Sequence, residues 1–248
     1  MQRDQAPDNP DDRRSEPIFN APAVVVGLVV LFALVHLGRE LLSESDDEWL
    51  TIALAFVPAR YGELGGELPG APWSDASSFV THIFVHGNLP HLVINSAWLL
   101  AVGTPTARRM DPVPFLLFFT LCGVAGAMAF LLLNLTLLAP MVGASGAISG
   151  LMGAVFRLLY GARDNAGRML LREHPEAAPS LSLRGTFACR PALIAIAVWV
   201  IVNFVFAFGL GGLSTSGGVA WEAHLGGFFA GLLAFGLFDR GRQTDVPC

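Results

Sequence analysis

A stretch of 45 residues without one charged side chain, Pro112–Phe156, constrains this chain more than any other feature. It is too long for a single membrane helix, which needs about 20 apolar residues to cross a bilayer. Polar and helix-breaking residues interrupt it at Asn134, Thr136, Pro140 and Gly143. The stretch therefore predicts two membrane-spanning helices, one over about 112–134 and one from about 145 to 160.

The overall composition supports a membrane protein. Hydrophobic residues make up 53% of the 248 residues, and the mean hydropathy is +0.56. Charged residues make up 14%, against about 25% in ordinary soluble domains. The net charge of −5 gives no basic footprint for nucleic acid. No Cys or His spacing indicates a zinc site, so we expect no nucleic acid, no metal and no cofactor.

The apolar segments predict six spans in an all-α polytopic bundle. The other four are expected at Ala21–Leu37, Phe79–Ala107, Pro191–Phe208 and Ala223–Phe238. Before them, residues 1–20 are acidic, lack the features of a signal peptide and are predicted to be disordered. The membrane domain then covers 21–238, and 239–248 forms a short tail. Between spans, we expect a short interfacial helix over Trp49–Val57 and a polar loop over Gly161–Arg190.

The distribution of Arg predicts the orientation. If the N-terminus starts inside, the inner segments and the inner end of the fourth span carry 13 of the 15 Arg residues. The outer segments carry only Arg39 and Arg60. Cytoplasmic loops of membrane proteins are enriched in Lys and Arg. Both termini are therefore expected in the cytoplasm, which agrees with an even number of spans.

Polar residues inside spans are costly and are functional candidates by default. The second span carries His86 just before its helix, and His91 and Asn95 one turn apart on one face. These histidines could also be ordinary interfacial residues. Ser145, in Gly143-Ala144-Ser145-Gly146, follows Pro140 and so begins a helix, where free N–H groups suit an oxyanion. A Ser in a membrane helix more commonly bonds its own backbone.

His224 begins the sixth span, one turn before the small-residue face of Gly227 and Gly231. The fourth span has a matching strip of Gly146, Gly150 and Gly153, so the two helices are predicted to approach closely, although such faces are often packing devices only. With the orientation above, the second, fourth and sixth spans all enter from outside beside these polar residues. Ser145 and His224 would then form a nucleophile and its base. No Asp or Glu lies within the spans to complete a triad.

In this combination and order, HGNLPHLVIN, GASG and AHLGGFFAG resemble the rhomboid family of intramembrane serine proteases, over about Ala21–Phe238. The resemblance implies a six-transmembrane-helix rhomboid-like bundle of the simple bacterial form, in the inner membrane. It implies Ser145 as nucleophile and His224 as base, with His91, Asn95 and the Ser145 N–H lining the oxyanion hole. His86, Gly143 and Gly146 match positions near the active site. The substrates would be single-pass or polytopic membrane proteins, cleaved within the lipid bilayer.

Two positions depart from the family pattern. Ser77-Ser78 replace a Trp-Arg pair of the outer loop, and Ser149 replaces a Tyr that stacks on the catalytic His in some members. Some other group must therefore hold His224. An inactive rhomboid-like protein that binds membrane helices, or a small transporter, are the alternatives. For substrate access we expect the glycine-rich stretch Gly209–Gly218 to be mobile and the fifth span to move as a gate.

Overall fold

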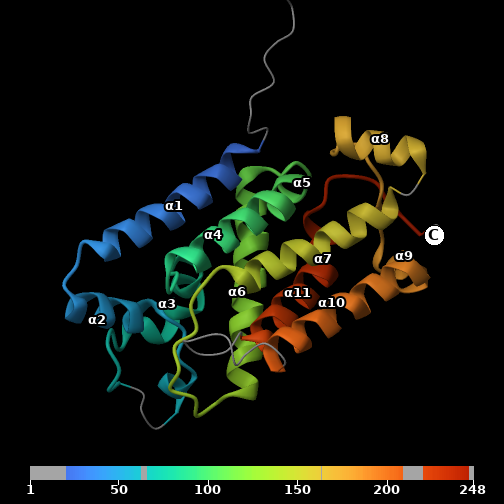
Figure 1. Ribbon diagram of the computed structural model, residues 1–248. Helices are drawn as coiled ribbons and strands as arrows, with labels where there is room; N and C mark the ends of the chain where they lie inside the picture. The colour runs from blue at the N-terminus through green and yellow to red at the C-terminus, as the bar shows by residue number, and fades with distance from the viewer. Residues whose placement is uncertain (1–20, 63–65, 163, 209–219, 246–248) are drawn as a thin grey trace, which may run out of the picture.

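The computed structural model describes residues 21–62, 66–162, 164–208 and 220–245, and it is built almost entirely of helices (Figure 1). The expected disorder of residues 1–20 and the expected mobility of Gly209–Gly218 lie outside these described residues. α2 and α3 lie at one end of the bundle, and α8 lies at the opposite end (Figure 1). By the predicted orientation these are called the outer and the inner end.

Among the described residues, four helices are long and apolar enough to cross a membrane. They are α1 (Ala23–Glu40), α6 (Pro112–Leu133), α10 (Arg190–Phe208) and α11 (Trp221–Phe238). All four lie within about three residues of the expected ends. α6 and α10 are apolar on all sides, which is typical of helices that contact lipid or other helices rather than water.

The other two expected spans are less regular. The second is a continuous helical rod of α4 (Leu89–Trp98), the π-helical turn η3 (Leu99–Gly103) and α5 (Thr104–Ala107). The fourth is α7 (Ser145–Gly161). The rod covers only the later part of the expected segment Phe79–Ala107, and the expectation that His86 lies just before the helix is confirmed. Asn88 caps α4 by accepting a hydrogen bond from the His91 N–H at 2.9 Å, so the helix begins only after it.

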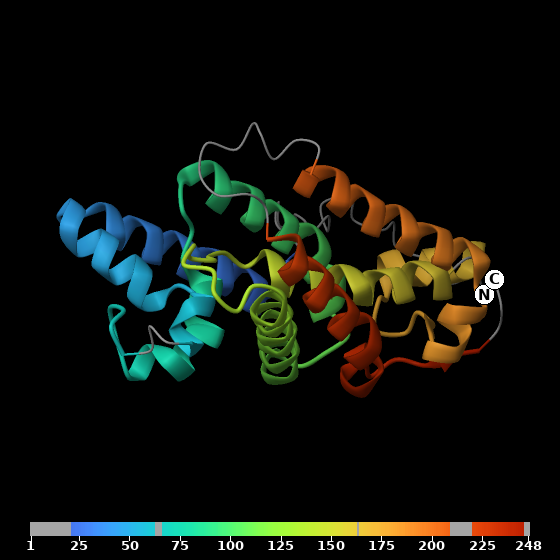
Figure 2. The same ribbon diagram turned by 90° about the horizontal axis from the view of Figure 1, so that it is seen from below.

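α7 lies in the middle of the bundle, surrounded by α4, α6, α10 and α11 (Figure 2). The predicted glycine contact is present between α7 and α11. A Cβ atom at Gly227 would overlap the carbonyl oxygen of Gly146, and one at Gly231 would overlap that of Gly150. Only glycine permits this approach of two backbones. The close contact fixes the start of α11 against the start of α7.

The outer loop between the first two spans contains α2 (Glu44–Leu54), η1 (Pro58–Tyr61), α3 (Trp73–Thr81) and η2 (His82–Phe84). The short helix expected at Trp49–Val57 therefore begins earlier, because Ser43 accepts a hydrogen bond from the Asp46 N–H and caps it. Hydroxyl groups join the two helices. Ser74 Oγ donates to the Ala53 carbonyl at 2.6 Å, and Thr81 Oγ1 donates to the Leu54 carbonyl at 2.7 Å.

The sequence left open what stabilises this loop where Ser77-Ser78 replace the family pair. Ser78 Oγ lies 3.0 Å from the Tyr61 hydroxyl, which donates at 2.8 Å to the Asp75 carbonyl. The buried Arg60 donates to the carbonyls of Ile52 and Pro69, at 3.1 and 3.0 Å. The loop is thus held by a hydroxyl network and one buried guanidinium.

The inner segment 161–190 is more ordered than the expected loop. It contains α8 (Asn165–Glu173), the strand β1 (Ser180–Leu181) and α9 (Leu183–Ala188). β1 pairs in parallel with β2 (Gln243–Thr244) of the C-terminal tail. Two residues of pairing are too few to hold the tail by themselves, and side chains supply the rest.

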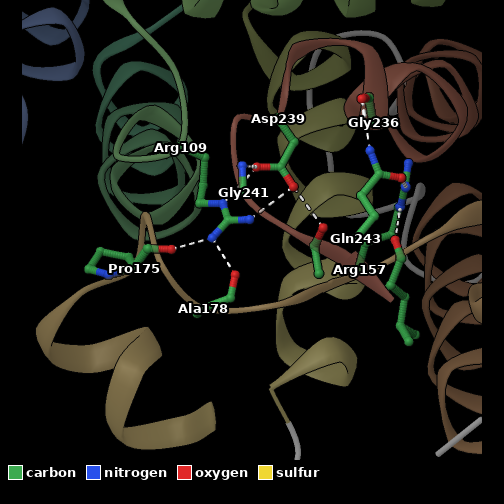
Figure 3. Close-up of polar contacts among 10 residues, drawn as sticks. Arg109, Arg157, Pro175, Ala178, Gly236, Asp239, Gly241 and Gln243 are labelled. Carbon is green, nitrogen blue, oxygen red and sulfur yellow. Dashed lines mark hydrogen bonds and ion pairs between the residues drawn. The ribbon is translucent and has the colours of Figure 1, made fainter. Parts of the chain in front are cut away.

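Two buried Arg residues make these side-chain contacts at the inner end (Figure 3). Arg109 forms a two-point ion pair with Asp239, at 2.7 and 3.0 Å, and also donates to the carbonyls of Pro175 and Ala178. Ser180 Oγ donates to the same carboxylate at 2.7 Å. We call Arg109, Asp239 and Ser180 the inner cluster.

Arg157 lies at the inner end of α7 and joins three segments. Its Nε donates to the Leu181 carbonyl at 2.7 Å. Its Nη1 donates to the Leu232 carbonyl and its Nη2 to Gln243 Oε1, both at 3.1 Å. The guanidinium also lies 5.4 Å from the centre of the Phe235 ring, within the range of a cation–π contact. Arg157 therefore connects α7 to α11, β1 and the tail.

Candidate active site

Ser145 is the first residue of α7, as the sequence predicted from Pro140 and Gly143. The N-cap residue is Ala144, and among the described residues no side chain accepts a hydrogen bond from the first turn. By contrast, the side chains of Asn88 and Ser43 cap α4 and α2. The first N–H groups of a helix have no partner within that helix. The start of α7 therefore presents both the Ser145 hydroxyl and uncapped donors at the positive end of the helix dipole.

The outer loop holds the segment that leads to Ser145. Phe56 and Met141 form an antiparallel bridge, with N···O distances of 3.0 and 2.8 Å. The Ala59 N–H donates to the Leu137 carbonyl at 3.0 Å, and the Gly143 N–H donates to the His82 carbonyl at 2.9 Å. A segment between two helices is thus fixed by backbone hydrogen bonds to a loop about 60 to 85 residues earlier in the chain. This fixes the direction in which α7 begins.

His91 and Asn95 lie beside Gly143. A Cβ atom built on Gly143 would be 2.7 Å from His91 Nε2 and 3.9 Å from Asn95 Nδ2. Gly143 also has a φ angle of +113°, which side-chain-bearing residues rarely adopt. Glycine is therefore needed here for both conformation and space. Asn95 Nδ2 donates to the His91 carbonyl at 2.9 Å, and its second hydrogen remains for another acceptor.

His86 lies behind His91 and is fully buried. The two imidazole rings are 5.2 Å apart between centroids, in an edge-to-face arrangement. Neither ring nitrogen of His86 has a hydrogen-bond partner among the described residues. Its backbone is fixed instead, because Arg39 donates to the His86 carbonyl at 2.8 Å while it forms an ion pair with Asp47.

His224 lies in the first turn of α11, and the neighbouring residue Ala223 packs on Gly146 of α7. The structure therefore places His224 and Ser145 on facing first turns. His224 Nδ1 lies 3.0 Å from Asn203 Oδ1 on α10. The sequence analysis did not assign Asn203 to the site. The signal was present, since Asn203 is a lone amide within an otherwise apolar segment.

Residues from four spans therefore meet at the outer end of the bundle. They supply a hydroxyl at one helix start, an imidazole in the first turn of the adjoining helix, and side-chain and backbone donors near the hydroxyl. A nucleophile next to a base, with donors for a developing negative charge, is the arrangement that acyl transfer requires. Among the described residues no group of three or more His, Cys, Asp or Glu side chains could hold a metal ion.

Comparison with known protein families gives one match. A family model described as Rhomboid domain matches residues 73–240, which is more than half of the chain. The matched region includes all the residues that meet at the outer end. A comparison with curated proteins finds no match.

Proposed function

The chain belongs to the rhomboid family, and from this premise we propose that it is an intramembrane serine endopeptidase that uses Ser145 and His224 as a catalytic dyad. The observation that carries the proposal is the meeting of three sequence motifs at one end of the bundle. His91 and Asn95 lie beside Gly143, two residues before Ser145, and the turn that carries His224 packs on Gly146.

The chemistry follows the usual two steps of acyl transfer. The Ser145 hydroxyl oxygen attacks the carbonyl carbon of the scissile peptide bond, and His224 accepts the hydroxyl proton. When the tetrahedral intermediate collapses, the C–N bond breaks and the imidazolium returns this proton to the departing amine. A water molecule then attacks the acyl-enzyme, with His224 again as base, and releases a carboxylate product and the free Ser145.

The negative charge on the intermediate needs preorganised donors. The uncapped N–H groups at the start of α7, the second hydrogen of the Asn95 amide and the His91 ring lie near Gly143 and would supply them. We place His86 in a different role. A buried imidazole without a protein partner suits an ordered water, and its place beside His91 would bring that water to the acyl-enzyme.

The protein is an integral membrane protein, and we propose that its substrates are membrane proteins that reach the dyad laterally. α4 and α10 lie on the same side of α7 (Figure 2). The exposed face of α4 and η3 carries a shallow, open apolar hollow of about 310 Å³, lined by Ile94, Ala97, Trp98 and Ala101. An apolar hollow on a membrane helix suits an apolar segment of another protein. Movement of α10 as a gate remains part of this proposal.

We also propose that the site faces the outer side of a bacterial inner membrane, with both termini in the cytoplasm. The strong asymmetry of the Arg residues supports this orientation. It places the inner cluster and the C-terminal tail on the cytoplasmic side. Fluorescence or cysteine-accessibility tags at the two termini of the protein in cells would test it.

The test of the proposed activity is active-site labelling by a fluorophosphonate probe in detergent or in vesicles. The wild-type protein should be labelled, and Ser145→Ala and His224→Ala should each lose essentially all labelling, because a dyad acts as a unit. Ser149→Ala is the matched control, since Ser149 lies one turn further along the same helix. It should keep its labelling.

A folded wild-type protein that reacts with no fluorophosphonate would contradict the proposal and favour an inactive rhomboid-like protein that binds membrane helices. Labelling that survives Ser145→Ala would place the nucleophile elsewhere. Proteomic comparison of membranes that contain wild-type or Ser145→Ala protein would then identify the substrates.

A further inference from the structure

Asn203 is a polar side chain where the surrounding sequence is apolar. It lies in the outer half of α10, a span in which the side chains found buried, Ala192 and Ile196, belong to the inner half. An amide in such a helix is costly unless its hydrogen-bonding groups find partners. In the structure both do, because Nδ2 donates to the Trp199 carbonyl at 2.9 Å and Oδ1 lies 3.0 Å from His224 Nδ1.

The hydrogen bond from Nδ2 to the Trp199 carbonyl determines which atom is the donor between Asn203 and His224. The amide nitrogen can only donate and the amide oxygen can only accept. Since Nδ2 is committed to the backbone of its own helix, Oδ1 is the atom that faces the imidazole. His224 Nδ1 must therefore carry a hydrogen and donate it. In a neutral imidazole the other nitrogen, Nε2, then has the free lone pair.

This tautomer is the one that a general base needs. We propose that Asn203 is a positioning residue that holds His224 as the Nδ1–H tautomer, with Nε2 free to accept the Ser145 proton. The inference rests on the proposed dyad. Asn203 takes the place of an orienting carboxylate, because the one acidic side chain in the first turn of α11, Glu222, is bonded to Asn134 instead, and Ser149 replaces the stacking Tyr. A neutral amide here performs the orienting part of the third member of a catalytic triad.

Aromatic contacts between α10 and α11 hold the Asn203 side chain in place. The Trp199 ring stacks on Phe228 of α11 at 4.1 Å between centroids, with 15° between the planes. Further out, the Phe204 ring lies 4.9 Å from that of Trp221. These two contacts flank Asn203 on α10 and hold it against the first turn of α11.

Few charged or titratable groups lie near His224 in the described structure. His91, on α4, is the other titratable group that acts on it. The carboxylate of Glu222 lies two residues away but accepts a hydrogen bond from Asn134 Nδ2 at 3.0 Å. Asn203 is thus the hydrogen-bond partner that the described structure gives to the His224 ring.

Two nearly isosteric substitutions separate this role from simple packing. Asn203→Leu keeps the size and removes the acceptor, whereas Asn203→Asp keeps the acceptor and adds a negative charge. The measurement is the reaction of Ser145 with a fluorophosphonate over a range of concentration and pH, resolved into a maximal rate, kinact, and a half-saturating concentration, KI. Val205→Ala, on the exposed face of α10, is the control and should react like the wild type.

Asn203→Leu should lower kinact by about 10- to 100-fold, part of the usual contribution of a general base, and leave KI within about twofold. Asn203→Asp should restore most of kinact. It should also move the acid limb of the pH profile to higher pH, since a neighbouring carboxylate favours the protonated imidazole. A residue with a purely structural role would not produce that shift. If Asn203→Leu lowers the melting temperature, Asn203→Ala is measured in the same way.

Wild-type kinact in both Asn203→Leu and Asn203→Ala would overturn the inference. So would equal loss in the Leu and Asp variants, or a rise in KI with unchanged kinact, which would indicate a role in access. These outcomes all require a wild-type protein whose labelling depends on Ser145. Absence of that labelling would overturn the proposed dyad, and the inference with it.

Discussion

The two ends of the bundle differ in how fully their buried polar groups are hydrogen-bonded. At the inner end, Arg109 and Asp239 are fully buried and make several hydrogen bonds each, in addition to their ion pair (Figure 3). At the outer end, both ring nitrogens of His86 lack a partner in the described structure, and no side chain caps the start of α7. We call the inner end saturated, because its buried polar groups all have hydrogen-bond partners in the described structure, whereas the outer end keeps donors and acceptors without partners.

The difference indicates that the inner end stabilises the fold and the outer end serves the proposed reaction. Buried polar groups that are fully paired fix one arrangement of the chain, while unpaired ones cost free energy. At the outer end, the unpaired His86 ring and the uncapped start of α7 lie where the proposed reaction would need them, for a water and an oxyanion. Because α7 and α11 run through both ends, the saturated end can support the unsaturated one. This relation predicts which substitutions affect stability, which affect activity and which affect both.

The largest effect is expected where both ends depend on the same contact. Gly231→Ala would place a Cβ atom onto the Gly150 carbonyl oxygen, between the backbones of α7 and α11. Neither backbone can move aside without separating the helices. We expect a loss of more than about 3 kcal/mol of stability, at the upper end of overpacking costs, and loss of fluorophosphonate labelling. Thermal unfolding in detergent and labelling at the same temperature would measure both.

Gly27→Ala is the matched control. Gly27 lies in α1, and a Cβ atom there meets nothing within 4 Å. Ala has the higher helix propensity by about 1 kcal/mol, so this variant should be unchanged or slightly more stable, with full labelling. If the two variants behave alike, the glycine contact between α7 and α11 does not support the two ends.

The second effect should appear first at the inner end. Arg109→Met leaves the Asp239 carboxylate buried without its ion-pair partner. Removing one partner of a buried pair typically costs about 3–5 kcal/mol. We expect a lower melting temperature, and labelling of Ser145 that stays normal at temperatures where the variant is folded. Hydrogen exchange should show early opening of the tail and of segment 175–181.

Arg240→Met tests whether burial is the cause. Arg240 forms an ion pair with Asp111, but both side chains are more than half exposed. Exposed pairs contribute about 0–1 kcal/mol, so the melting temperature should barely change. An equal loss from Arg109→Met and Arg240→Met would contradict the contrast between a saturated inner cluster and ordinary surface pairs.

The sequence predicted what depends on local pattern and on depth in the membrane. The charge-free segments gave most helix ends to within a few residues, and Gly227 with Gly146 indicated which helices approach. That Ser145, His91 and His224 belong to one end of the bundle followed from counting spans. These predictions succeed because a bilayer permits few arrangements of an apolar helix.

Contacts between distant side chains could not be predicted in the same way. Arg109 and Asp239 are 130 positions apart, and no sequence pattern in either segment indicates that they pair. The same is true of Asn203 and His224, and of the hydroxyl network that replaces the family pair in the outer loop. The polar segment 161–190 looked like a loop because its helices are short and its strand pairs with the tail. Each of these depends on packing that pattern alone does not encode.

The smallest expected effect is the pH dependence of stability that Asp239 causes, and it tests the contrast between the two ends most directly. Burial alone would raise the pKa of Asp239. Hydrogen bonds from Arg109, Ser180 and the Gly241 N–H, with the charge of Arg109, instead hold that pKa below its ordinary value. A carboxyl group with a lowered pKa stabilises the fold above about pH 3.9, its unfolded value, and loses this contribution only as the pH falls further. The wild-type inner cluster should therefore contribute equally at pH 7 and pH 5.

Arg109→Met should reverse this behaviour. Without the guanidinium, burial is the dominant influence, and it raises the pKa of the Asp239 carboxyl above its unfolded value. Stability is then penalised at high pH and recovered as the carboxyl is protonated, by about 1.4 kcal/mol for each unit of raised pKa. The difference in melting temperature between variant and wild type should thus shrink from pH 7 to pH 5. A difference that stays constant would mean that Asp239 is not confined to a buried site, and that the inner end is no more saturated than the outer one.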